Sequence, residues 1–502
     1  MRTKKAFYNI TLELVLQVVT LVSGLILPRL ILEAYGSAYN GVIQTIIRFL
    51  GYISVLTLGV AGPTRVAIYQ ALADGDDHKV SAVLKANELF MRKVALALVG
   101  YMIVLAVVYP YMVRDQFGWW DVALLVMIIG AGSLMEYLFG ITSRIFLVAN
   151  QEAYISLTLL IASKIVSTIV TVILILQGFS IHAVRLAMVV CFALEPVLIQ
   201  LIVRKKYHIR TDVEPDYSAL AHRGDAVAHS LADVISQNIG VFLLAILTSP
   251  VVISIYSVYN LVLENLQKIQ KAFTNNLEAV FGDIWARGEK AKFAEKLGTL
   301  EYLMCAFLLL VYTTTCSLIL PFVKLYTRDI TDANYILPTF AVLFVAASAA
   351  FSLRDPYIVA VQAAGRYKDT RMLAIREAVL NVVLSLVGIW LWGLSGIVFA
   401  ALVANLYRTI AYGIYIYRKM LEIPLRRFAA RWVWMLASGG VIIWLQQMIA
   451  AHALTIDSWM KWLVAGACYT VVAVAVTLAS SAVFYRRELR NSAQLVKAML
   501  KR

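Results

Sequence analysis

The sequence consists largely of long apolar runs separated by short charged segments. A helix needs about 20 apolar residues to cross a bilayer core. Backbone polar groups inside lipid must be satisfied within the segment, so such runs predict helices. We therefore expect an all-α polytopic membrane protein with about fourteen transmembrane helices. The expected spans are, within a few residues, 9–32, 41–63, 93–113, 121–149, 153–177, 181–203, 226–248, 257–280, 297–323, 334–362, 369–392, 395–417, 431–452 and 460–484.

The basic residues between the spans test this assignment independently. With the N-terminus in the cytoplasm and the loops on alternate sides, 31 of the 45 Lys and Arg residues fall in cytoplasmic segments. Only four fall in the opposite loops: Arg114, Lys324, Arg328 and Lys461. Lys and Arg collect on the cytoplasmic side of membrane proteins. We therefore expect a multi-pass membrane protein with both termini in the cytoplasm, and the net charge of +15 implies no nucleic-acid partner.

The two halves of the sequence form an internal repeat at an offset of 220 residues. Scarce polar residues match: Glu13 with Asp233, Gln17 with Gln237, Asn40 with Asn260, Gln44 with Glu264 and Arg48 with Lys268. The first and seventh spans run in the same direction, so we expect a parallel repeat. The predicted domains are a six-helix bundle at 1–210, a second at 220–420, two additional helices at 431–484 and a basic cytoplasmic tail at 485–502.

Spans 1, 2, 7 and 8 carry the matched polar residues, and we expect them to line a water-filled cavity between the bundles, called the lumen below. Each Lys or Arg at mid-membrane costs about 2.5–3.5 kcal/mol, so charges within spans should face water or one another. The matched cations Arg48 and Lys268 indicate an anionic, phosphate-bearing substrate. The alternative is a pair of structural cations balanced by acids such as Glu264.

Other charges within the spans have simpler explanations. Arg376 beside Glu377, and Arg354 beside Asp355, are expected to be satisfied groups at helix ends. Arg144 lies close enough to a span end to reach the membrane surface. The repeat also places the start of the eighth helix near Asn260, which would put Lys268 roughly 12 Å in from the outer edge at 1.5 Å per residue.

Several short motifs carry a resemblance to a known family. They are Leu27-Pro28-Arg29, Tyr35-Gly36-Ser37, Asn40-Gly41, Gly59-Val60 and Ala363-Ala364-Gly365-Arg366-Tyr367, followed by Asn381, Ser385, Gly393 and Gly396. With these motifs the chain resembles the lipid-linked oligosaccharide (O-antigen and polysaccharide) flippases of the multidrug/oligosaccharidyl-lipid/polysaccharide (MOP) exporter superfamily. The resemblance implies two six-helix bundles that alternate between inward-open and outward-open states.

The resemblance also implies a substrate, a polyprenyl-pyrophosphate-linked oligosaccharide moved from the cytoplasmic to the outer leaflet for surface polysaccharide synthesis. Its partners would be membrane lipid, polysaccharide polymerase machinery and a coupling H⁺ or Na⁺. The expected substrate-binding residues are Arg48, Lys268, Lys271, Lys164, Gln17, Gln237, Asn238 and Gln44. The expected ion-coupling residues are Glu264, Asp233 and Glu13, with Glu264 the strongest candidate for a charge that changes during transport.

Two other functions remain open at this point. A cation-coupled multidrug antiporter of the same superfamily would use the acidic residues Glu13, Asp233 and Glu264, although the matched cations argue against it. A membrane polysaccharide polymerase or ligase would usually need a large external loop, and no external loop exceeds about a dozen residues. The sequence has no glycine-rich nucleotide loop, and its four cysteines have no zinc-ligand spacing. We therefore expect neither an enzyme nor a cofactor or metal.

Overall fold

The computed structural model describes residues 2–57, 60–207, 209–210, 212–218, 238–274, 277–453 and 455–490. Every regular element among these residues is a helix, which confirms the all-α prediction. Among the described residues, eleven helical segments are long and apolar enough to cross a membrane. The number fourteen stays a prediction for three reasons: the segment Thr11–Thr57 covers two expected spans, the span at 226–248 is described only from Asn238 onward, and the helix at the expected span 257–280 is not among the eleven.

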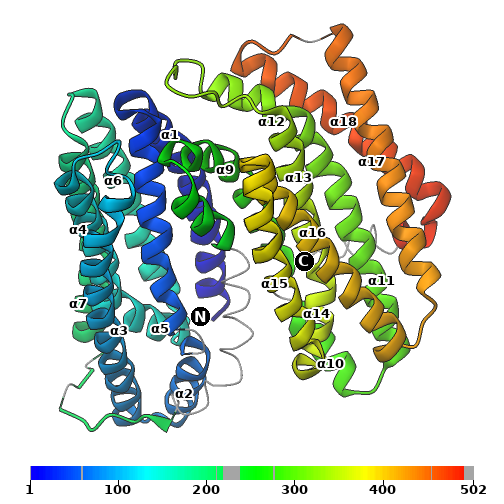
Figure 1. The fold of residues 1–502 in the computed structure, drawn as a ribbon. Coiled ribbons are helices and arrows are strands. Elements are labelled where there is room, and N and C mark those ends of the chain that lie inside the picture. Colours follow the sequence, from blue (N-terminus) through cyan, green and yellow to red (C-terminus); the bar gives the residue numbers. More distant parts are fainter. Residues whose placement is uncertain are drawn as a thin grey trace. The chain divides into compact units, whose positions relative to one another are not determined.

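The helices divide into two compact units, Met1–Ser257 and Val258–Arg502 (Figure 1). In the first unit α1 packs on α6, α6 on α7, and α4 on both α3 and α7. Its elements are α1 (Arg2–Gly51), the 3-10 helix η1 (Tyr52–Thr57), α2 (Ala61–Asp74), α3 (Asp77–Met112), α4 (Trp119–Met135), the π-helix η2 (Glu136–Gly140), α5 (Ile141–Ala149), α6 (Ala153–Leu176), α7 (Ile181–Lys206), the helix Asn238–Leu247 and the first turns of α9 (Pro250–Thr274).

In the second unit α16 packs on α13 and α15, and α12 packs on the α17–α18 pair. The pair lies side by side in Figure 1. The elements after α9 are α10 (Leu277–Ala286), α11 (Lys290–Phe307), the π-helix η4 (Leu308–Tyr312), α12 (Thr313–Tyr326), α13 (Pro338–Leu353), α14 (Asp355–Ala363), α15 (Tyr367–Trp392), α16 (Leu394–Tyr415), the π-helix η5 (Ile416–Met420), α17 (Leu425–Ala453) and α18 (Trp459–Phe484).

The first two expected spans meet at Gly36, inside the segment α1. Gly36 has φ 83° and ψ 171°, a conformation that a residue without a Cβ adopts without strain. At the matching position of the repeat the chain has Tyr256. There the helix does not break, and α9 runs from Pro250 to Thr274 without interruption. Proline suits this start because the first turn of a helix does not use its N–H.

The prediction that the eighth helix begins near Asn260 is therefore wrong. Lys268 follows the observed start, Pro250, by eighteen residues, which is about 27 Å along the axis rather than about 12 Å. Lys268 thus lies far along α9, toward the end that the loop charges assign to the cytoplasm. The matching Arg48 follows the Gly36 break by only twelve residues, about 18 Å.

Two glycines set the close packing of α15 on α16. A Cβ added at Gly396 would lie 1.9 Å from the carbonyl oxygen of Gly388, and one at Gly388 would lie 2.6 Å from that of Gly396. Because the contacts are with backbone atoms, no side chain can move aside. Gly396→Ala is therefore expected to force the two helices apart and to destabilise the protein by about 1–3 kcal/mol.

Thermal unfolding of the detergent-solubilised protein would measure this effect. The matched control is Gly440→Ala in α17, where an added Cβ meets no atom within 4 Å. The control should unfold at or slightly above the wild-type temperature, since Ala favours a helix over Gly. Equal unfolding temperatures for both variants would contradict the close α15–α16 packing.

Candidate functional site

A stripe of polar side chains follows one face of α9. The Asn260 Nδ2 donates to Glu264 Oε2 at 3.0 Å. Lys268 Nζ lies 2.9 Å from Glu264 Oε1, one turn further along. The side chains of Lys268 and Glu264 are 48% and 41% exposed. Asn260, Glu264 and Lys268 thus form a connected polar row, in which the acid is bonded at both oxygens.

The matching residues of α1 are arranged differently. Asn40 is buried, and its Nδ2 donates to the hydroxyls of Ser254 at 2.8 Å and Ser257 at 3.3 Å, in the first turns of α9. Gly41 lies against the carbonyl of Pro250. Asn40 thus hydrogen-bonds α1 to the start of α9, whereas the matching Asn260 hydrogen-bonds to Glu264 within α9. Beyond this joint Gln44 and Arg48 are half-buried on α1.

Three other predicted substrate residues lie on different elements. Lys271 Nζ lies 5.3 Å from the centroid of the Phe351 ring, a cation–π contact. Lys164, on α6, accepts the Thr168 hydroxyl with its carbonyl at 2.7 Å. The carbonyl of Asn238 accepts the Tyr52 hydroxyl at 3.1 Å.

The remaining predicted residues lie on α1 or outside the described part of the chain. Gln17 is half-buried and Glu13 is exposed, both on α1. Asp233 and Gln237 lie outside the described residues. Arg48 belongs to the unit Met1–Ser257 and Lys268 to the unit Val258–Arg502. The joint lining by Arg48 and Lys268 therefore stays a prediction.

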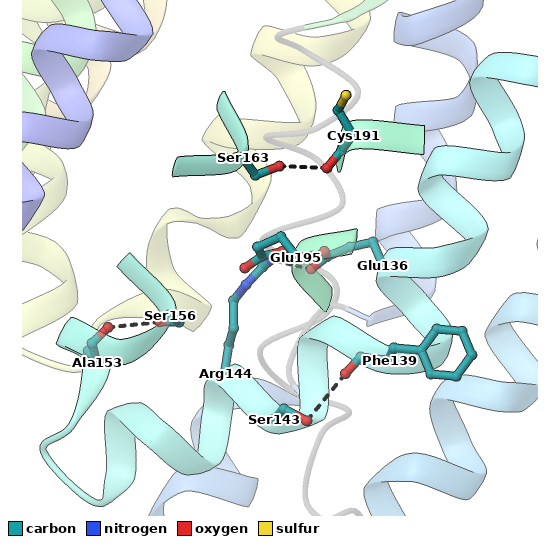
Figure 2. A network of polar contacts seen from close by, with 9 residues as sticks. All are labelled: Glu136, Phe139, Ser143, Arg144, Ala153, Ser156, Ser163, Cys191 and Glu195. Carbon is teal, nitrogen blue, oxygen red and sulfur yellow. Dashed lines mark hydrogen bonds and ion pairs between the residues drawn. The ribbon is translucent and has the colours of Figure 1, made fainter. Parts of the chain in front are cut away.

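A charged network in the first unit joins η2, α5 and α7 (Figure 2). Arg144 donates to both oxygens of Glu136, at 2.5 and 2.8 Å, and to Glu195 Oε2 at 2.5 Å. Arg144 is thus paired with two carboxylates, while its reach to the membrane surface stays a prediction. Sequence reasoning missed Glu195 altogether, although a carboxylate inside an apolar span is itself a signal of a buried ionic partner.

A second network lies in the core of the second unit. Arg408 Nη1 donates to Glu377 Oε2 at 2.8 Å, and Arg354 Nη1 lies 3.5 Å from Glu377 Oε1. The three side chains are 0–3% exposed. The expected pairing of Glu377 with its neighbour Arg376 is wrong, because consecutive residues point to different sides of a helix. Arg376 is exposed and faces away from this network.

Arg376 instead lines a cavity of about 710 Å³ between α15 and the end of α16. Arg366, Arg418 and Lys419 add three more cations, and Asp369 is the one acid of the lining. A second cavity of about 700 Å³ lies between α11, α17 and the chain after α18, beside the buried contact of Glu301 with Arg431 and Tyr417. No group of three or more His, Cys, Asp or Glu among the described residues could hold a metal ion.

Solved structures provide a comparison for the fold. The lipid II flippase MurJ in an inward closed conformation matches with a TM-score of 0.64 and 12% identity, over 94% of this chain and 99% of that one. An inward-facing multidrug resistance MATE family transporter of the MOP superfamily matches with a TM-score of 0.56 and 14% identity, over 81% and 96%. The protein has the fold of the MOP-superfamily transporters.

A third structure with the MOP fold is a point mutant of the Vibrio cholerae MATE transporter VcmN. It matches with a TM-score of 0.54 and 15% identity, over 84% of this chain and 99% of that one. No protein-family model and no curated protein sequence matches the chain. The likeness is thus one of fold, and it agrees with a multi-pass membrane protein.

The MOP-fold comparisons differ in how much of this chain they cover. The flippase leaves 6% of the 502 residues unmatched, about 30 residues. The pair α17–α18 spans Leu425–Phe484, which is 60 residues. At least half of this pair is therefore matched in the flippase. The two MATE structures leave 16–19% unmatched, enough to omit the pair entirely.

Proposed function

We propose that the protein moves a polyprenyl-pyrophosphate-linked oligosaccharide from the cytoplasmic to the outer leaflet by alternating access, for surface polysaccharide synthesis. The observation that carries the proposal is the exposed Lys268 on α9, in repeat register with the half-buried Arg48 of α1. Exposed cations on the helices of a membrane transporter suit an anionic cargo better than a neutral one.

The pyrophosphate group explains the use of both cation types. An Arg guanidinium binds phosphate oxygens in pairs, whereas a Lys ammonium acts as a mobile point charge. Lys268 lies further along its helix than Arg48 does. In our proposal Lys268 and Lys271 meet a pyrophosphate arriving from the cytoplasmic side, and Arg48 binds it deeper in the lumen.

Polar residues of the same helices would complete the binding site. Gln17, Gln44, Gln237 and Asn238 carry amides that can donate to phosphate and sugar oxygens. Lys164 on α6 would add a further cation. For ion coupling we propose Glu264, Asp233 and Glu13, with H⁺ or Na⁺ as the coupling ion. The protein would lie in the bacterial inner membrane with both termini in the cytoplasm. Polymerase machinery would receive the product at the outer leaflet.

The additional pair α17–α18 also supports a lipid-linked cargo. A solved lipid II flippase includes at least half of this pair in its match, while the multidrug transporters need not include it. The alternative function, cation-coupled multidrug export, would need a carboxylate open to a drug cation. Glu264 is bonded to Lys268 and Asn260 in this structure, so a cationic drug would have to displace these two residues from the Glu264 carboxylate.

Cells provide the first test of the proposal. Loss of the protein should remove surface polysaccharide while lipid-linked oligosaccharide accumulates on the cytoplasmic leaflet, and the sensitivity to cationic dyes should not change. Plasmid-borne wild-type protein should reverse both effects. Normal surface polysaccharide together with increased dye sensitivity would contradict the flippase and favour the multidrug antiporter.

A further inference from the structure

The network of Glu136, Arg144 and Glu195 has an unequal charge count. One guanidinium contacts two carboxylates (Figure 2), so the three side chains carry a formal charge of −1 when all are ionised. Such a charge within transmembrane helices is costly unless something neutralises it. The carboxylates therefore share one cation and require either a second cation or a proton.

Glu195 is the less favourably placed of the two carboxylates. Its side chain is 2% exposed, against 31% for Glu136. Its Oε2 accepts from Arg144, but its Oε1 is buried with no hydrogen-bond partner in the described part of the chain. A buried, unbonded carboxylate oxygen loses its hydration without compensation. Adding a proton there removes the excess charge of the whole network.

The elements that pack on α7 offer few other charges. They are mainly α4, η2, α5 and α6, and α3 contacts α7 through Glu88, which pairs with Arg204 at 3.3 Å. Besides Glu136 and Arg144 they contribute Tyr137 of η2, Asp121, and Tyr154 and Lys164 of α6. Asp121 lies at the far end, where its carbonyl contacts His182. Lys164 of α6 directly follows Ser163, whose hydroxyl donates to the carbonyl of Cys191. Cys191 lies one turn before Glu195 on α7.

The network also lies where the helices can rearrange. Glu136 begins the π-helical turn η2, a departure from α-helix that is frequent at functional sites. Gly140 in that turn leaves room for the Glu136 carboxylate, since a Cβ there would lie 2.6 Å from its Oε2. Pro196 lies inside α7 directly after Glu195 and supplies no N–H to the hydrogen bonds of the helix. Arg144 therefore joins a π-helical turn to a stretch of α7 that lacks one backbone hydrogen bond.

We propose that Glu195 binds and releases one proton during the transport cycle, a role that rests on the proposed transport function. The proton enters through the partly exposed carboxylate of Glu136, Arg144 keeps its charge throughout, and the proton is carried on Glu195 Oε1. The protonated Glu195 is neutral and attracts Arg144 less strongly, so Arg144 stays on Glu136 and α7 is loosened from α5. Release of the proton restores the three-membered network, and no other reactant is consumed.

Infrared difference spectroscopy of the purified full-length protein tests this assignment without any substrate. Acidification should produce the C=O stretch band of a protonated buried carboxylic acid. Glu195→Gln should abolish that band, whereas Glu295→Gln, an exposed carboxylate paired with Arg487, should leave it unchanged. A band that persists in Glu195→Gln would overturn the proposal. A band change driven by Na⁺ at constant pH and lost in Glu195→Gln would overturn it as well, in favour of a sodium site.

A second variant covers the case in which Glu195→Gln does not fold. Gly140→Ala displaces the Glu136 carboxylate but keeps every charge, so it should shift the pH midpoint of the band rather than abolish it. An unchanged midpoint would contradict the coupled network. In transport assays Glu195→Gln should lose the part of the pH dependence of the rate that follows the midpoint of this band. A pH-independent wild-type protein that still shows the band would refute the coupling role while leaving the proposed cargo intact.

Discussion

Arg48→Ala and Lys268→Ala are each expected to reduce the transport of lipid-linked oligosaccharide by about tenfold or more, because a hydrogen bond to a charged group contributes about 1.5–3 kcal/mol. Both residues hold positive charge at matching repeat positions on the two helices proposed to line the lumen. The protein level in the membrane should stay near that of the wild type. The initial rate of transport measures the first effect, and quantitative immunoblotting of the membranes measures the protein level.

Conservative and distant substitutions serve as controls for these two variants. Lys268→Arg keeps the charge and should retain most of the rate. Arg287→Ala removes an exposed arginine of the same kind of i,i+4 pair, with Asp283 at 3.0 Å, and should transport like the wild type. Full rates in both Arg48→Ala and Lys268→Ala would show that these cations are structural.

Glu377→Gln is expected to destabilise the protein by about 3–5 kcal/mol, the cost of removing one partner from a buried ion pair. Glu377 is 1% exposed, and its carboxylate contacts the guanidiniums of both Arg354 and Arg408. The variant leaves those two buried cations without the carboxylate they share. Thermal unfolding in detergent should reveal a large fall in the midpoint temperature and a reduced yield of folded protein.

The control for this variant is Glu295→Gln. Glu295 also pairs with an arginine, Arg487 at 2.9 Å, but both side chains are more than half exposed. A surface pair of this kind contributes about 0–1 kcal/mol, so its unfolding temperature should hardly change. Equal stability of the two variants would mean that Glu377 is not the centre of the buried network.

Hydropathy and spacing suffice to predict the helices and the polar face of α9. Asn260, Glu264 and Lys268 are four residues apart, and this local spacing alone brings them into contact. The prediction for the start of α9 is wrong because the repeat does not preserve the break at Gly36. The sequence contains the contrary signal, since Tyr256 at that position disfavours a positive φ.

The buried ion pairs between helices cannot be predicted from hydropathy and local spacing. Glu377 and Arg408 are 31 residues apart, and Arg144 and Glu195 are 51 apart. Their pairing depends on which faces of α5, α7, α15 and α16 pack together, and no local spacing determines that. Sequence neighbours such as Arg376 and Glu377 are the plausible pairs from the chain alone, yet they face different surroundings.

The central claim concerns the cargo, and reconstitution tests it most directly. Purified protein in vesicles would be given a fluorescent polyprenyl-pyrophosphate-linked oligosaccharide on one leaflet, with a membrane-impermeant quencher reporting its arrival on the other. Our account predicts transport above protein-free vesicles, competition by unlabelled substrate but not by a cationic dye, and loss of the signal in the Arg48→Ala, Lys268→Ala double variant. Dye transport without movement of the labelled lipid would contradict it.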